Sequence, residues 1–254
     1  MVVTRAREQA GPLSQRLRAF GAIPVEFPVI AFEPPEPGGD LDRALSNLQR
    51  YDWIMFTSAN GVHFVVERMR ALGLKPEALM ELRIGAIGPA TAARLERYGL
   101  RSDFVPSEFV AEAVVEQIGD VAGRRVLLPR ADIAREALPE GLRRRGADVE
   151  QVVAYRTVAG RPDENLAPLL RERRIDAVTF TSSSTVRNFF TVLEQMGLAR
   201  EETLRLLDGV IVAAIGPITA RTARDLGLRI SIEAEQYTTD GLVEALVEVL
   251  GPGE

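Results

Sequence analysis

The chain has 254 residues, of which 46% are hydrophobic and 26% charged, so it is not disordered, collagen-like or of low complexity and is long enough for two domains. With no cysteine and one histidine, it lacks the residues for a disulfide scaffold, a thiolate nucleophile or a cysteine- or histidine-ligated metal. The net charge of −5 argues against an extended polyanion such as DNA, although a small acidic ligand fits a local positive cleft. We therefore expect neither a metal nor a nucleic-acid partner.

Neither a membrane span nor a secretion signal is expected. The longest apolar runs have the length of a strand, far below the about 20 residues that a span needs. The chain opens with the strand-like Val2-Val3-Thr4 and no signal-peptide core. These features predict a cytoplasmic protein.

In chain order, the predicted elements repeat as a short, a long, a short and a long unit. The short unit, an apolar strand ending in arginine and followed by a helix, starts at Val2 and returns at Leu127. The long unit carries Phe-Thr-Ser at residues 56–58 and again at 180–182. It continues to Ile-Gly-Pro-x-Thr-Ala at residues 87–92 and again at 215–220. The prediction of the fold starts from this repetition.

The long units alternate apolar runs with amphipathic helices. The runs lack polar alternation, which is typical of strands covered on both faces of a parallel sheet. They comprise residues 53–56, 84–87, 177–180 and 211–215. Alternating strands and helices predict an α/β fold with doubly wound parallel sheets and right-handed crossovers.

The junctions suggest how the units pair. Residues 33–39 and 159–163 are rich in proline and glycine, which suits interdomain linkers, whereas residues 119–123 look like an ordinary loop. We therefore expect one discontinuous domain of residues 1–35 plus 159–254, an inserted domain of residues 36–158, and a substrate cleft between them at the hinge. The alternative is a tandem split near residue 122.

Four loops follow predicted strands and precede helices. Two are rich in hydroxyls, at residues 57–60 and 181–184, and two read Gly-Pro-x-Thr, at residues 88–91 and 216–219. Each alone is typical of a helix N-cap, but four matched loops favour a cleft for an anionic ligand. No strand carries the GxGxxG fingerprint, so we expect no nucleotide cofactor.

Four further side chains are candidates for contact with such a ligand. Arg5 and Arg130 stand at equivalent ends of the two short-unit strands, where a guanidinium can bind a carboxylate; a surface ion pair is the alternative. Tyr155 lies close to the second linker and Tyr237 in the loop before the last helix. A phenol beside a hinge cleft can give a proton or a hydrogen bond to a leaving oxygen.

Together these residues resemble the uroporphyrinogen-III synthase family over essentially the whole chain. The resemblance is carried by the opening Val3-Thr4-Arg5, the two Phe-Thr-Ser runs, both Ile-Gly-Pro-x-Thr-Ala runs and residues 234–238. It implies two flavodoxin-like domains joined by a two-stranded linker, a monomer and no cofactor. It also implies a lyase of heme biosynthesis whose substrate is hydroxymethylbilane, a linear tetrapyrrole with eight carboxylates. Through a spiro-pyrrolenine intermediate, the family closes this chain with ring D inverted and releases water.

The resemblance also implies roles for single residues. Tyr155 is expected to assist departure of the substrate hydroxyl. Thr91 and Thr219 are expected to bind carboxylates together with the amides of Gly88 and Gly216. The other expected substrate contacts are Arg5, Ser58, Asn60, Arg130, Ser182, Ser183, Tyr237 and Thr238. Many relatives have proline where Ser183 stands, which weakens the case for that residue.

Two other functions compete with this one. The same two-domain cleft could sense a small anion and signal by closing, without catalysis. A sugar-phosphate enzyme on a flavodoxin-like fold rests on fold analogy alone.

Overall fold

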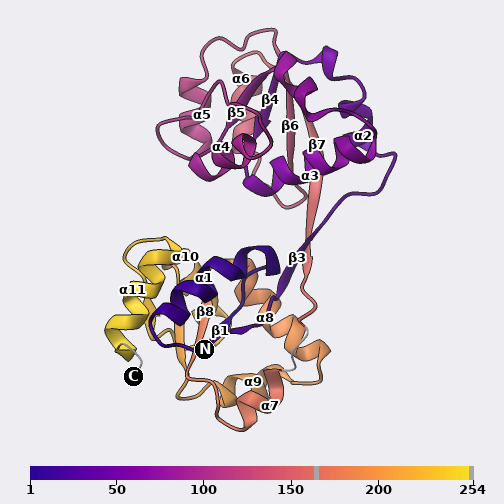
Figure 1. Ribbon diagram of the computed structural model, residues 1–254. Helices are drawn as coiled ribbons and strands as arrows, with labels where there is room; N and C mark the ends of the chain where they lie inside the picture. The colour runs from indigo at the N-terminus through magenta and orange to yellow at the C-terminus, as the bar shows by residue number, and fades with distance from the viewer. Residues whose placement is uncertain (163–165, 252–254) are drawn as a thin grey trace. The chain divides into compact units, whose positions relative to one another are not determined.

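The computed structural model describes residues 1–162 and 166–251 and divides the chain into two compact units (Figure 1). Unit 1 consists of Met1–Ala31 and Val158–Glu254, and unit 2 of Phe32–Thr157. The predicted second junction ends on Asp163, which lies outside the described residues. Each unit has its own sheet and core, and each is described by itself below.

Unit 1 contains a five-stranded sheet in the order β10-β9-β8-β1-β2, and all its paired strands run parallel. The strands are β1 (Val2–Val3), β2 (Val25–Glu26), β8 (Ala177–Phe180), β9 (Ile211–Ala214) and β10 (Ile232–Glu233). Counted within the unit, this is the order 2-1-3-4-5 of flavodoxin-like folds. The prediction of a doubly wound parallel sheet is therefore confirmed for this unit.

The helices of unit 1 cover both faces of the sheet. They are α1 (Arg7–Ala19), α7 (Leu166–Arg171), α8 (Ser183–Gln195), α9 (Arg200–Leu206), α10 (Pro217–Asp225) and α11 (Thr239–Leu250). Helix α1 packs with α11, while α8 packs with α9 and α10. The core between α1, α11 and the sheet includes Leu13, Leu17 and Leu242, which are fully or almost fully buried.

Unit 2 repeats the pattern with its strands in a different chain order, β3-β7-β6-β4-β5. These strands are β3 (Ile30–Glu33), β4 (Trp53–Phe56), β5 (Arg83–Ala86), β6 (Arg125–Ala131) and β7 (Asp148–Ala159). A parallel bridge from Gly85 to Phe104 extends the sheet beyond β5. If β3 is left out and the segment at Phe104 is counted as the fifth strand, the order starting from β6 is again 2-1-3-4-5, so unit 2 is a circularly permuted copy of unit 1.

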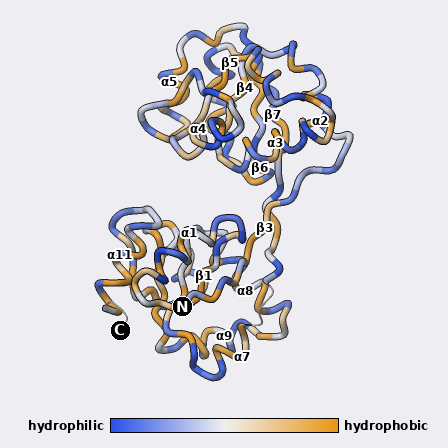
Figure 2. The backbone as a smooth tube through the Cα atoms, in the orientation of Figure 1, coloured by the Kyte–Doolittle hydropathy of each residue, from blue (hydrophilic) through white to orange (hydrophobic). Residues whose placement is uncertain are grey.

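The helices of unit 2 also lie on both faces. They are α2 (Asp40–Leu45), α3 (Ala59–Ala71), α4 (Pro89–Glu96), α5 (Ala111–Gln117) and α6 (Ala137–Arg144), with 3-10 helices at Leu48–Arg50 and Pro76–Glu81. Helices α3 and α4 pack together over one core, and α5 and α6 over the other. In Figure 2 the strands between them are mostly orange because their residues are hydrophobic. Burial on both faces explains why β4, β5 and β6 lack polar alternation.

Parallel pairing brings the predicted loops of each unit to one edge of its sheet. In unit 1, Phe180 pairs with Ala214, so β8 and β9 end at the same level and the loops after them begin side by side. In unit 2, Phe56 pairs with Ala86 in the same way. Ligands bind beyond this carboxyl edge in open α/β sheets. We call the carboxyl edge with its loops and helix N-termini the rim of each unit.

In the described ranges, the longest helices are too short and too polar to cross a bilayer.

Candidate functional site

On the rim of unit 2, two predicted site residues lie in contact. Ser58 precedes α3 as its N-cap, and its Oγ accepts a hydrogen bond from the amide of Gly61 at 3.0 Å. The hydroxyl of Tyr155, on β7, lies 3.1 Å from the same Oγ. The strand between β7 and β4 is β6, and its small Ala131 pairs with Tyr155. A small side chain there lets the phenol reach Ser58 although 97 residues separate the two in sequence.

Aromatic rings enclose the Tyr155 phenol. Its ring stacks on Phe64 at 5.4 Å and meets the edge of Phe32 at 5.5 Å, and the residue is 7% exposed. Burial raises the pKa of Tyr155, as does the nearby Asp132 carboxylate, while the hydrogen bond with Ser58 opposes them. Tyr155 therefore keeps its proton throughout the neutral pH range, and its hydroxyl can donate a hydrogen bond.

The Gly-Pro-x-Thr loop of unit 2 opens helix α4. Gly88 is its N-cap with φ of 96°, and Pro89 occupies the first turn. The amide of Gly88 donates to the carbonyl of Ala86 at 3.2 Å, and the hydroxyl of Thr91, 3% exposed, donates to the carbonyl of Ile87 at 3.3 Å. Both predicted donors therefore have partners within the loop. Their contact with a substrate stays a prediction and requires those partners to be exchanged.

The matching loop of unit 1 opens α10 at Gly216 and Pro217. Thr219, like Thr91, is buried, with 5% of its surface exposed. In the same rim, Thr238 caps α11 by accepting the amide of Gly241 at 3.0 Å, and Tyr237 stands 66% exposed. Of Thr219, Tyr237 and Thr238, Tyr237 therefore presents the most surface to a ligand.

In the hydroxyl-rich loop of unit 1, at the start of α8, the serine hydroxyls bond to other groups of the protein. Ser182 forms a capping box with Thr185, and its Oγ lies 2.9 Å from that of Ser184. Ser183 Oγ accepts from Thr222 at 2.8 Å and lies 3.4 Å from the carbonyl of Ile218, so it ties α8 to α10. These bonds account for both serines without a ligand. Their substrate contacts also stay predictions, as does that of Asn60, a partly exposed residue in the first turn of α3.

Arg5 follows β1 on the rim of unit 1, and its guanidinium makes only one long hydrogen bond among the described residues. Its Nη2 donates to Gln9 Oε1 at 3.4 Å, and its buried Nε has no hydrogen-bond partner among the described residues. Burial lowers the pKa of Arg5, without an opposing carboxylate in the described part of the chain. A partly buried positive charge with unused donors is suited to a carboxylate ligand.

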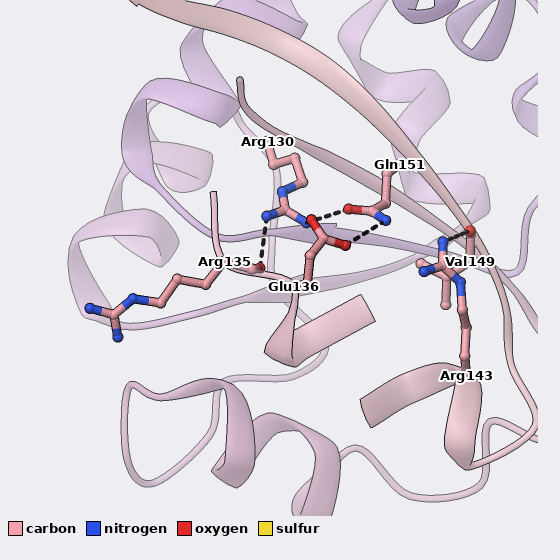
Figure 3. A network of polar contacts seen from close by, with 6 residues as sticks. All are labelled: Arg130, Arg135, Glu136, Arg143, Val149 and Gln151. Carbon is pink, nitrogen blue, oxygen red and sulfur yellow. Dashed lines mark hydrogen bonds and ion pairs between the residues drawn. The ribbon is translucent and has the colours of Figure 1, made fainter. Parts of the chain in front are cut away.

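Arg130, the equivalent residue of unit 2, is 6% exposed and engaged inside the protein. Its Nη1 donates to Gln151 Oε1 and, at 3.1 Å, to Glu136 Oε1, while its Nη2 donates to the carbonyl of Arg135 at 2.7 Å. Figure 3 shows this network holding the loop between β6 and α6 against β7. The structure thus gives Arg130 a set of partners that the equivalence with Arg5 did not predict, and its substrate contact stays a prediction.

One exposed rim residue escaped the sequence analysis. Phe109 is 58% exposed and lies against the N-cap glycine of α4, as Tyr237 lies against that of α10. Residues 106–110 occupy the same place before α5 as residues 234–238 occupy before α11. Extending the repeat alignment to this segment would have revealed Phe109.

The rims carry hydroxyls and helix N-termini, and the rim of unit 1 carries the Arg5 guanidinium, which has no ion-pair partner in the described part of the chain; such groups suit ligands with several carboxylates. Among the described residues, no cluster of three or more histidine, aspartate or glutamate side chains is placed to hold a metal ion. The cofactor-free reaction stays an expectation from the resemblance.

Comparison with known proteins identifies the family. The family model described as uroporphyrinogen-III synthase HemD matches residues 11–244. The chain is 37% identical over 250 residues to a uroporphyrinogen-III synthase of Synechococcus elongatus, covering 97% of this chain and 93% of the relative.

Two solved structures share the fold. A mutant uroporphyrinogen III synthase from the extremely thermophilic bacterium Thermus thermophilus aligns with a TM-score of 0.61 at 22% identity, over 98% of this chain and 99% of the other. The uroporphyrinogen-III synthetase from Helicobacter pylori aligns with a TM-score of 0.64 at 19% identity, over 90% and 94%. The predicted fold class is confirmed. From the family model and the sequence identity, the chain belongs to the uroporphyrinogen-III synthase family.

Proposed function

We propose that this chain is a lyase that closes hydroxymethylbilane to uroporphyrinogen III with loss of water. The family match supports the reaction. The contact between Tyr155 and Ser58, at the carboxyl edge of the sheet in unit 2, is the observation on which the site assignment depends. A substrate with eight carboxylates and a leaving hydroxyl needs groups that bind anions and a hydrogen-bond donor, and the rims and the Tyr155 hydroxyl are suited to these two tasks.

The chemistry begins at the terminal hydroxymethyl group. Its oxygen takes up a proton and leaves as water, while the neighbouring pyrrole nitrogen supplies electron density to the remaining carbon. A carbon–carbon bond to the substituted position of ring D gives the spiro-pyrrolenine. Breaking and re-forming bonds to that ring inverts it. The closed macrocycle then loses one ring proton, which balances the proton taken up.

Tyr155 and Ser58 act together in the first step. Ser58 Oγ accepts from the amide of Gly61, and when it also accepts from the Tyr155 hydroxyl its own hydrogen is free for the substrate oxygen. Tyr155 then strengthens the donor that meets the leaving hydroxyl. Its raised pKa keeps it protonated for this role.

The rims supply the charge recognition. Arg5, whose Nε has no partner among the described residues and whose Nη2 makes only a long bond to Gln9, binds one substrate carboxylate. The N-termini of α4 and α10 favour negative charge, because the helix dipole is positive there. Holding a flexible chain in one folded shape is the larger part of such catalysis, because it removes the entropy of closure from the barrier.

The decisive experiment is product analysis. Hydroxymethylbilane generated enzymatically is incubated with the protein, and the isomers are separated after oxidation. Spontaneous closure gives mostly the type I isomer, so an excess of type III supports the proposal. Type I alone, with or without bound tetrapyrrole, would contradict it and favour the small-anion sensor.

Replacing Tyr155 tests the first step. Tyr155→Phe keeps the stacked ring but removes the hydroxyl, so we expect turnover to fall about 10-fold to 1,000-fold while the melting temperature stays unchanged. Tyr51→Phe is the matched control, because Tyr51 is also a buried tyrosine of unit 2 but precedes β4 at the opposite edge. Turnover equal to that of the unmodified protein in Tyr155→Phe would remove Tyr155 from the mechanism.

The predicted cytoplasmic location, monomeric state and lack of a nucleic-acid partner stay predictions, and sedimentation of the purified protein tests the second of them.

A further inference from the structure

Each unit places an exposed aromatic ring on the N-cap glycine of its Gly-Pro-x-Thr helix. A methyl group on Gly216 would lie 2.8 Å from Cδ1 of Tyr237. A methyl group on Gly88 would lie 3.4 Å from Cγ of Phe109. At Gly216 the absence of a side chain allows the ring to lie directly on the backbone, whereas at Gly88 a methyl group would make an ordinary van der Waals contact with the ring.

Each of the two rings lies against the backbone of an N-cap glycine and yet remains largely exposed to solvent. Phe109 is 58% exposed and Tyr237 66% exposed. Each rim carries another exposed apolar side chain, Val110 next to Phe109 in the chain and Ile218 two residues after Gly216. Exposed apolar side chains on a polar rim are typical of a ligand contact. The same arrangement occurs in two units whose sequences differ at these positions, which argues against chance.

We propose that Phe109 and Tyr237 each stack against a pyrrole ring of the linear tetrapyrrole substrate and position it on the rim. This inference rests on the proposed function. A pyrrole offers a flat, electron-rich face that stacks on an aromatic ring, and its acidic side chains extend from its edge. A pyrrole on either ring would direct these carboxylates toward the first-turn amides of α4 or α10, beside the glycine that the ring covers.

This geometry gives the polar and the aromatic groups of the rims different tasks. Amides and Arg5 recognise the charge that every polycarboxylate carries, whereas the two aromatic rings recognise the pyrroles. Phe109 and Tyr237 are positioning residues, since neither carries a group that takes part in bond breaking. Their removal should therefore weaken binding more than it slows turnover.

The test replaces each ring with an aliphatic side chain of similar size. In Phe109→Leu and in Tyr237→Leu we expect KM for hydroxymethylbilane to rise about 2- to 10-fold with little change in kcat. Phe109→Tyr should keep the KM of the unmodified protein, because it keeps the aromatic face. Phe20→Leu is the matched control, since Phe20 is exposed in unit 1 but follows α1 away from the rim.

Binding gives a second readout that does not depend on catalysis. Uroporphyrin III, which carries eight carboxylates on a planar tetrapyrrole, is titrated and followed by its absorption. Both leucine variants should bind it about 2- to 10-fold more weakly than the unmodified protein.

The outcomes separate the two proposals. If the unmodified protein yields type III product and both leucine variants keep its KM and Kd, stacking is wrong and the proposed function stands. A lower KM in these variants would mean that the rings cover the site, and it would also overturn stacking. If the protein forms only type I product yet loses uroporphyrin affinity in the variants, the proposed function fails and ring recognition stands. Failure of the unmodified protein to bind or convert a tetrapyrrole overturns both.

Discussion

Arg5 and Arg130 occupy equivalent positions after two related strands, but their guanidinium groups have different surroundings. The Arg5 Nε is buried without a partner among the described residues, whereas Arg130 donates to Gln151, Glu136 and the Arg135 carbonyl. A hydrogen bond to a charged group contributes about 1.5–3 kcal/mol to the stability of the fold. Only Arg130 makes several such bonds within the described part of the protein. Arg5 is available for binding, and Arg130 stabilises unit 2.

Substitution by glutamine should separate these roles. In Arg5→Gln we expect KM for hydroxymethylbilane to rise about 10- to 100-fold with an unchanged melting temperature, because a charged donor is lost and no ion pair between described residues is broken. In Arg130→Gln we expect the melting temperature to fall by about 3–10 °C, because a buried network loses its centre. Steady-state kinetics and thermal unfolding of both variants are the measurements. A stable Arg130→Gln with a raised KM would instead identify Arg130 as a substrate ligand.

These residues also show which parts of the site can be predicted from sequence. The N-caps Ser58 and Ser182 could be predicted, because a cap depends only on the few residues that follow it. The partners of Arg130 could not, because Gln151 reaches it through strand pairing and Glu136 through the path of a loop. The contact between Tyr155 and Ser58 likewise depends on β6 lying between their strands.

At the scale of elements, the stability of the short helix α2 depends on a side chain of the longer helix α3. Helix α2 has six residues, too few to be stable by itself. Asp42 of α2 accepts two hydrogen bonds from Arg68 of α3 and one from the amide of Gly38. The two side chains are 11% and 19% exposed, so water screens their interaction weakly. This ion pair fixes the segment that enters the sheet of unit 2.

The ion pair predicts a pH dependence of stability. The hydrogen bonds from Arg68 lower the pKa of Asp42 below its ordinary value of about 3.9. The carboxylate therefore stabilises the fold above about pH 4, and this contribution is lost as the pH falls through the lowered pKa. Urea unfolding between pH 3 and pH 7 should show this loss. Asp42→Asn should be destabilised by about 1–3 kcal/mol at pH 7 and should lose part of the pH dependence.

Asp40 provides the control within the same helix. It pairs with Arg43, but the two side chains are 71% and 68% exposed, so we expect Asp40→Asn to change the unfolding free energy by no more than about 0.5 kcal/mol. Equal effects of Asp40→Asn and Asp42→Asn would show that the buried ion pair has no special role.

At the scale of the whole molecule, the repeat in the sequence corresponds to two sheets of the same order that begin at different points of the chain. The strands and helices themselves could be predicted, since their periodicity is local. The permutation could not be derived from the repeats alone, because the same four units also fit a tandem split near residue 122. In the structure such a cut falls between α5 and β6 and separates β6 from its partner β4.

Expression of fragments tests this organisation. Residues 32–157 contain β4 to β6, most of β7 and both cores of unit 2, so we expect this fragment to unfold cooperatively by itself. Residues 158–254 lack β1, which pairs with both β2 and β8, and lack α1, which supplies Leu13 and Leu17 to the core. We therefore expect this second fragment to show no cooperative transition until residues 1–31 are added as a peptide. Thermal unfolding followed by circular dichroism distinguishes the cases. A cooperative transition in residues 158–254 alone, or its absence in residues 32–157, would mean that the strand order does not define the folding units.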